Sequence, residues 1–228
     1  MRFSAMAVAC GLVCGCSSSA YDAAYAKRLT DYRAAAEFAP LRGDAVTLAD
    51  GRLTLRVPAI LGSQLDGSED PKRATPPFIG DFPGLVTAYE GLADAADGRR
   101  ALVLTVGLVP AAERRKDEVA EAILRQVRGD EEFGKAVWQK GRELVDAAGD
   151  TRRWDVLELK GAQPFVVEKA GVMTVIRIAG TTEVWLSADP GQKASVILAF
   201  RVPDDAAGKL PLPALSTLTA RTVSQPAP

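Results

Sequence analysis

The sequence predicts an α+β fold in which an antiparallel β-sheet, built as a meander, is covered by helices. Short runs rich in Val, Ile, Thr and Trp follow one another through the second half of the 228-residue chain, and turn residues separate them. A strongly amphipathic helical pattern lies in the middle of the chain, and a shorter one lies near its end. One face of such a sheet needs a helical cover, and these two patterns can supply it.

The chain is expected to divide into a targeting segment, a tether and one domain. Met1 and Arg2 give a positive start, and the apolar run that follows, residues 3–15, is too short to cross a bilayer. The expected parts are a signal peptide at 1–15, a lipid-anchored tether with an N-terminal helix at 16–43, a single α+β domain at 44–223 and a disordered tail at 224–228.

The end of the apolar run, Val13-Cys14-Gly15-Cys16, resembles the lipobox of bacterial lipoproteins. The resemblance implies that Cys16 becomes the mature N-terminus and carries a diacylglycerol on its thiol, often with a third acyl chain on its amine. Two or more chains anchor a protein stably in a membrane. Ser17, rather than Asp, implies a cell-envelope location at the outer membrane, facing the periplasm. A plain secretory signal cut near Ala20, or an apolar arm that stays on the protein, is the alternative.

Composition excludes several chemistries. The chain has no histidine, and its three cysteines all lie in the first 16 residues. This composition excludes the usual Ser-His-Asp and Cys-His nucleophile systems. It also excludes zinc sites made of His and Cys and haem ligation by either residue. Lys and Arg total 28 and Asp and Glu total 29, so no basic surface for nucleic acid is indicated. We expect no cofactor, no metal and no catalytic residue.

The first half of the chain begins with a predicted helix at about residues 20–38, because Tyr21, Tyr25, Leu29 and Tyr32 recur at the spacing of one helix face. This stripe either lies on the domain or spaces it from the membrane, or it docks on a partner.

The elements that follow are predicted from turn residues and periodicity. They are two strands around Asp50-Gly51, a long surface loop at 59–83, strands at 84–92 and 99–110, a helix at 111–130 and a shorter helix at 131–140.

The second half is predicted to contain three pairs of strands and a closing helix. The pairs cover residues 142–161, 164–180 and 181–203, with turns at Gly149-Asp150, Ala170-Gly171 and Asp189-Pro190-Gly191. The closing helix covers 211–223 and is expected to pack through Leu212, Leu215 and Leu218. Trp138, Trp154 and Trp185 are interpreted as core or rim packing rather than as a ligand cage.

The layout resembles the PsbP-like α/β/α sandwich. The stretch "LTLRVP" would be the early strand, residues 113–128 the helix over the sheet, residues 154–201 the meander and residues 211–223 the closing helix. A calycin-type barrel is the alternative, since up-and-down strands dominate the second half.

The function predicted from these features is a membrane-anchored envelope lipoprotein that is not an enzyme and serves as an accessory, assembly or partner-binding domain. Its expected partners are membrane lipid, through Cys16, and an envelope protein. Two alternatives stay open: a carrier of an apolar ligand, and a hydrolase of envelope glycans that uses a pair of carboxylates.

Overall fold

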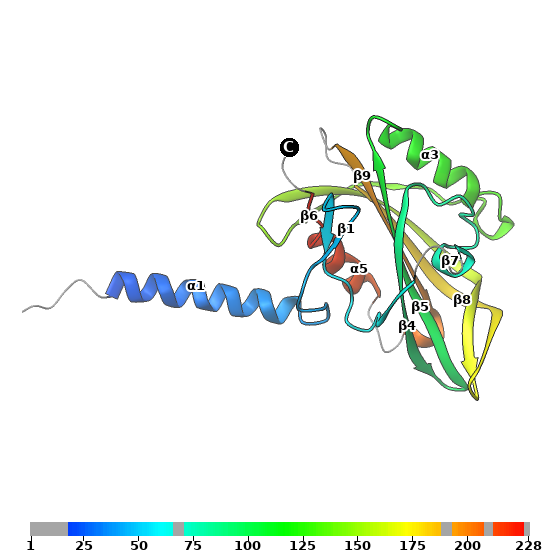
Figure 1. The fold of residues 1–228 in the computed structure, drawn as a ribbon, viewed down its shortest axis with the longest axis horizontal. Coiled ribbons are helices and arrows are strands. Elements are labelled where there is room, and N and C mark those ends of the chain that lie inside the picture. Colours follow the sequence, from blue (N-terminus) through cyan, green and yellow to red (C-terminus); the bar gives the residue numbers. More distant parts are fainter. Residues whose placement is uncertain (1–17, 66–70, 188–192, 208–211, 226–228) are drawn as a thin grey trace, which may run out of the picture. The chain divides into compact units, whose positions relative to one another are not determined.

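The computed structural model describes residues 18–65, 71–187, 193–207 and 212–225 (Figure 1). Cys16, the turn at 189–191 and the end of the tail at 226–228 lie outside the described residues. The chain forms two compact units, residues 1–38 and 39–228. Among the described residues, no helix combines the length and the apolar character that are needed to span a bilayer.

The first unit contains helix α1, Ser18–Glu37, which confirms the predicted N-terminal helix. Its tyrosines are exposed, and the rings of Tyr21 and Tyr25 stack with their centroids 6.5 Å apart. The two rings lie side by side because residues four apart are neighbours on one face of a helix.

The second unit is built on an antiparallel sheet of seven strands in the order β3-β4-β5-β9-β8-β7-β6, so the α+β prediction is confirmed (Figure 1). The calycin-type alternative is wrong, because the sheet is open and β3 and β6 are its edges. The strands are β3 Ser63–Leu65, β4 Leu85–Ala95, β5 Gly98–Pro110, β6 Gln139–Val145, β7 Thr151–Lys169, β8 Val172–Ser187 and β9 Ala194–Pro203. A separate hairpin joins β1, Val46–Leu48, to β2, Leu53–Leu55, around the predicted Asp50-Gly51 turn.

Helices lie on opposite sides of this sheet (Figure 1). Helix α5, Leu212–Arg221, and the β1–β2 hairpin pack on the face that carries Trp154, Trp185 and Phe200. Helix α3, Lys116–Val127, packs on the other face, against Leu157, Val184 and Ile197. Successive residues of β8 and β9 alternate between these two cores, as the pleat of a strand requires.

Two long strands replace four of the predicted ones. Residues 142–203 form four strands, not six, because β7 and β8 run through the glycines that were interpreted as strand ends. Gly161 and Gly180 are direct partners across the β7–β8 pair. The hairpin bends there, and beyond the bend β7 pairs with the start of β5 through Arg99↔Glu168 and Arg100↔Val167.

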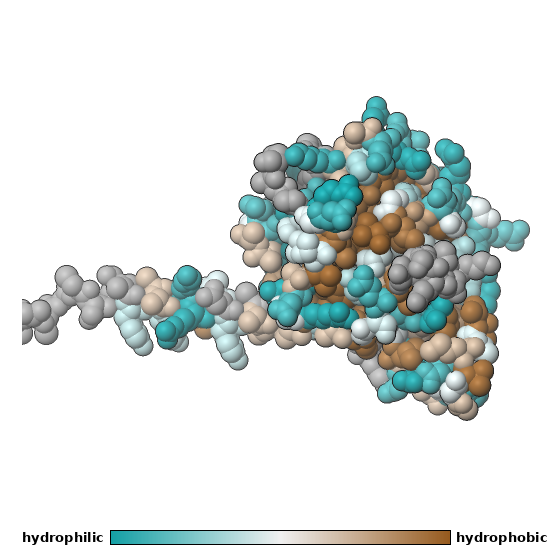
Figure 2. All heavy atoms as spheres, viewed as in Figure 1, coloured by the Kyte–Doolittle hydropathy of each residue, from teal (hydrophilic) through white to brown (hydrophobic). Residues whose placement is uncertain are grey.

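The outer end of the β7–β8 hairpin exposes aliphatic side chains, and Figure 2 shows apolar surface in that region. The exposed residues are Val172, Met173, Val175 and Ile176. They flank the turn at Ala170-Gly171, where both residues have positive φ angles of 51° and 80°.

The sequence predicts one long surface loop at 59–83, and the structure differs from this prediction. The segment contains β3 and the four-residue helix α2, Pro71–Ala74. Ala74, Ile79 and Phe82 are buried, and the hydroxyl of Thr105 on β5 donates a hydrogen bond to the carbonyl of Ala74. The prolines prevent a central strand but do not prevent these apolar side chains from packing on the sheet.

The predicted helix at 131–140 is also wrong. A single 3₁₀ turn, η1 at Glu131–Phe133, is followed by extended chain that leads into β6. Phe133 is buried against Phe78, with ring centroids 4.9 Å apart. Packing of this one aromatic residue, rather than helical periodicity, fixes the segment. A four-residue helix, α4 at Asp204–Ala207, follows β9 and was not predicted.

Asp146 holds the turn between β6 and β7. Its carboxylate accepts hydrogen bonds from the backbone amides of Ala148 and Asp150 at 2.9 Å and from Arg152 Nε at 2.7 Å. Burial alone would raise the pKa of Asp146, but the Arg152 side chain and the two amides together hold that pKa below its usual range. The carboxylate form therefore stabilises the fold.

We expect Asp146→Asn to lower the free energy of unfolding at pH 7 by about 1–2 kcal/mol, because the charge-assisted bond to Arg152 is lost. A lowered pKa in the folded state gives stability above the unfolded pKa, near 4, that is lost as the pH falls through the folded value. Urea unfolding at pH 7 and pH 3 should therefore show the gap between wild type and variant closing in acid. Asp150→Asn, at an exposed side chain, is the control and should change little; a gap that widens in acid would contradict the assignment.

Candidate functional site

A groove runs along the outer side of helix α3. The helix is amphipathic: Val119, Ile123 and Val127 are buried in the core, and its exposed positions include Asp117, Glu121 and Arg125. Figure 2 shows mostly hydrophilic surface in this region. The carboxylate of Glu118 accepts a hydrogen bond from the backbone amide of Arg115 at 3.0 Å and so fixes the first turn.

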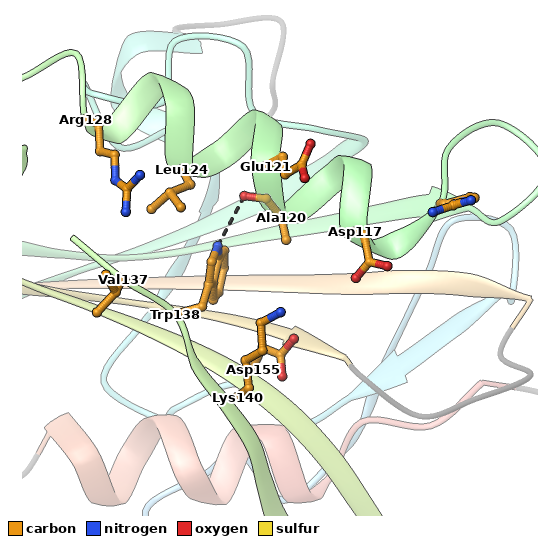
Figure 3. A pocket seen from close by; sticks show the side chains of 10 residues that line it. Asp117, Ala120, Glu121, Leu124, Arg128, Val137, Trp138, Lys140 and Asp155 are labelled. Atoms are coloured by element: carbon orange, nitrogen blue, oxygen red, sulfur yellow. Dashed lines mark hydrogen bonds between the residues drawn. The ribbon is translucent and has the colours of Figure 1, made fainter. Parts of the chain in front are cut away.

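The opposite wall of the groove is the extended segment 136–140 (Figure 3). Hydrogen bonds from side chains connect this segment to the helix. Trp138 Nε1 donates a hydrogen bond to the carbonyl of Ala120 at 3.1 Å. Arg128 donates to the carbonyl of Ala136 from Nε at 3.0 Å and from Nη2 at 2.8 Å. These bonds join side chains to backbone on both walls, so the groove is preformed.

The groove has a volume of about 410 Å³, and a neighbouring hollow of about 450 Å³ continues it along α3. Its apolar part consists of Leu124, Val137 and Trp138, and 63% of Val137 is exposed. Charges of both signs surround this part: Arg115, Asp117, Glu121, Arg128 and Lys140 (Figure 3).

Asp155 lies buried at one end of the groove, and its charge is already paired. Lys116 Nζ lies 2.6 Å from Oδ2, and the backbone amide of Gly141 donates to Oδ1 at 2.9 Å. A general acid needs a proton to give and a substrate atom within reach. The geometry of Asp155 is that of a structural ion pair, which does not favour the glycan hydrolase alternative.

Another hollow lies between the sheet and α5, but it is too small for a ligand. It is lined by apolar side chains that include Leu102, Phe200 and Leu212 and has a volume of about 20 Å³. Ligand pockets typically measure about 300–1,000 Å³. This hollow therefore does not provide the apolar cavity that the carrier alternative requires.

The structure separates the three tryptophans by role. Trp154 and Trp185 are buried and pack edge to face with ring centroids 6.1 Å apart, which confirms their interpretation as core. Trp138 is partly buried and forms a wall of the groove. Sequence reasoning missed the pairing of Lys116 with Asp155, since Lys116 stands in the run of charged residues 113–118, a pattern that is typical of a solvated helix face.

These elements define an α+β protein with an open antiparallel sheet between two layers that carry helices. No family model matches the chain, and no curated protein matches it. Several solved structures are similar. A Bacteroides thetaiotaomicron protein is 10% identical with a TM-score of 0.38, and the match covers 81% of this chain and 49% of that one. This chain therefore spans about half the length of the Bacteroides protein.

Two further similar structures have lengths closer to that of this chain. The Ran-binding protein Mog1p of Saccharomyces cerevisiae is 14% identical with a TM-score of 0.38, and the match covers 81% of this chain and 96% of that one. The cyanobacterial PsbP of Synechocystis is 9% identical with a TM-score of 0.40, and the match covers 80% of this chain and 92% of that one.

Proposed function

We propose that the protein is a lipoprotein of the bacterial cell envelope, anchored through Cys16, whose domain binds an extended segment of an envelope protein in the groove along α3. The observation that carries the proposal is the preformed, open groove with an apolar part at Leu124, Val137 and Trp138. An apolar centre with aromatic and arginine side chains inside a polar rim is typical of protein–protein interfaces.

The charges around the groove specify the chemistry of the partner segment. Arg115, Arg128 and Lys140 complement acidic residues, and Asp117 and Glu121 complement basic ones. The segment should present an apolar side chain to Trp138 and carry charges of both signs beside it. A strongly basic or strongly acidic polymer would meet like charge on one part of the rim.

The anchor is tested by Cys16→Ser. Without the thiol no diacylglycerol can be attached, so the protein should move from the membrane pellet to the soluble fraction. Cys14→Ser is the matched control, since it removes a thiol two residues away and should leave the protein in the pellet. Wild-type protein that is already soluble, or purified protein whose mass shows an unmodified N-terminus, would overturn the anchor.

The groove is tested by photo-crosslinking from a probe at position 137 in intact cells. Val145, on β6 and outside the groove, is 53% exposed against 63% for Val137 and provides the control position. We expect a protein adduct from 137 and none from 145. The captured segment, made as a peptide, should bind the purified domain and should lose at least tenfold in affinity in Val137→Asp but not in Val145→Asp. Equal effects of the two substitutions would refute the groove as the binding site.

A further inference from the structure

Arg201 is a buried cation near the end of β9. It is 5% exposed, and its neighbours Phe200 and Val202 belong to the core under α5, so the side chain of Arg201 lies on the opposite sheet face, the one that also carries α3. Nη2 donates a hydrogen bond to the carbonyl of Pro164 at 2.5 Å, and the guanidinium lies 5.1 Å from the centre of the Phe165 ring. Burial lowers the pKa of Arg201 to about 10.

The charge of Arg201 lacks an anionic partner in the described part of the chain. None of the ion pairs formed by the described residues includes Arg201, and its Nε atom is buried without a hydrogen-bond acceptor. A buried guanidinium is costly unless it is paired and hydrogen-bonded. One backbone carbonyl and one aromatic ring compensate only part of the cost of burying the Arg201 guanidinium.

Arg201 lines a pocket of about 310 Å³ that the bent β7–β8 hairpin creates. Because the hairpin bends at Gly161 and Gly180 and pairs with β5, it covers the sheet beyond the end of β9. Phe165, Val166 and Val175 come from the hairpin and give the pocket an apolar wall. Pro77 adds to this wall from the segment that follows α2.

The pocket carries a surplus of one positive charge. Arg73 Nη2 and Glu90 Oε2 form an ion pair 2.5 Å apart, and these are the remaining charged residues that line the pocket. Arg201 is therefore the cation that a ligand would neutralise. A carboxylate is planar, carries a single negative charge and can accept two parallel hydrogen bonds from a guanidinium.

We infer that this pocket binds a small organic carboxylate with a short apolar chain, with the carboxylate on Arg201 and the chain against Phe165, Val166 and Val175. The volume is at the lower end of the range for ligand sites, which restricts the ligand to a small molecule. The inference is independent of the groove along α3, because the two sites have no lining residue in common.

The test is calorimetric titration of the purified domain with hexanoate, with hexanol and with inorganic phosphate, each used alone. We expect hexanoate to bind, and hexanol and phosphate to bind at least tenfold more weakly. Arg201→Met keeps most of the length of the side chain but removes the charge, and it should weaken hexanoate at least tenfold. Arg177→Met removes an exposed arginine of β8 that does not line the pocket and should leave the affinity unchanged.

A second variant keeps the test decisive if Arg201→Met does not fold. Val175 lines the pocket yet is 67% exposed, so Val175→Trp can fill the pocket without disturbing the core. It should abolish hexanoate binding with the thermal unfolding midpoint unchanged. The inference would be overturned if the wild type did not bind hexanoate, or if it bound hexanol as tightly as hexanoate or phosphate more tightly than hexanoate. It would also be overturned if a folded Arg201→Met or Val175→Trp variant bound hexanoate with the affinity of the wild type.

Discussion

Trp185→Ala is expected to lower the free energy of unfolding by about 3–5 kcal/mol. The side chain is fully buried at the centre of the core between the sheet and α5, and its ring packs edge to face on Trp154. The guanidinium of Arg142 lies 4.8 Å from the centre of the Trp185 ring. The substitution therefore opens a large cavity and removes two ring interactions together.

A hydrogen bond adds to this cost. Trp185 Nε1 donates to Glu183 Oε2 at 3.1 Å, and the hydroxyl of Ser216 on α5 donates to the same oxygen at 2.5 Å. In the alanine variant the buried carboxylate loses this bond, and within the described part of the chain it keeps the bond from α5. Leaving a buried polar group with fewer partners costs free energy beyond the lost packing.

Trp138→Ala is the matched control, measured by urea unfolding with circular dichroism so that the loss of a fluorophore does not matter. Trp138 is only partly buried and lies in the groove rather than in the core. Its loss should cost about 1–2 kcal/mol, chiefly through less apolar burial and the missing bond to Ala120. Equal losses for the two variants would contradict the separation of core and groove tryptophans.

The parts of the fold that depend on local signals could be predicted from the sequence. The Asp50-Gly51 and Ala170-Gly171 turns both use positive φ angles, and glycine adopts such angles at no steric cost, so the hairpins lie where expected. The apolar stripe of α3 and the closing helix α5 follow from helical periodicity. In α5 the buried contacts include Ser216 and Thr219 as well as the predicted leucines at 212 and 215.

The parts that depend on contacts between distant residues could not be predicted. A glycine that ends a strand and a glycine that bends one look alike in sequence, and only the pairing of Gly161 with Gly180 distinguishes them. Arg201 stands in "AFRVP", which indicates a strand end near solvent. Its cover, Pro164 and Phe165, comes from more than thirty residues earlier in the chain.

The groove shows the same limit. Its walls are α3 and the segment 136–140, and the second was predicted as helix because "EEFGKAVWQK" has suitable spacing. The hydrogen bonds from Trp138 and Arg128 to backbone carbonyls determine the conformation of the segment 136–140, and no local sequence pattern predicts these bonds. Tertiary packing overrides weak helix propensity in short segments.

Gly180→Ala is expected to lower the free energy of unfolding by about 2–3 kcal/mol. A Cβ atom at this position would lie 2.4 Å from Cε2 of Phe165 and 3.0 Å from the carbonyl oxygen of Val202. Phe165 is itself buried, and its ring also packs on the guanidinium of Arg201, so the ring has little room to move away. The added methyl group would therefore displace the hairpin from the end of β9.

Two further variants separate this clash from a general effect of removing glycine. Gly62→Ala, at a position with no atom within 4 Å of the added Cβ, should be neutral or stabilising by up to about 1 kcal/mol. Phe165→Leu in the Gly180→Ala background should recover part of the loss, because a smaller side chain leaves space for the methyl group. In a double-mutant cycle the two substitutions should thus be less harmful together than the sum of their separate effects. Additive losses would mean that Phe165 does not pack on Gly180, and the bend would then need another cause.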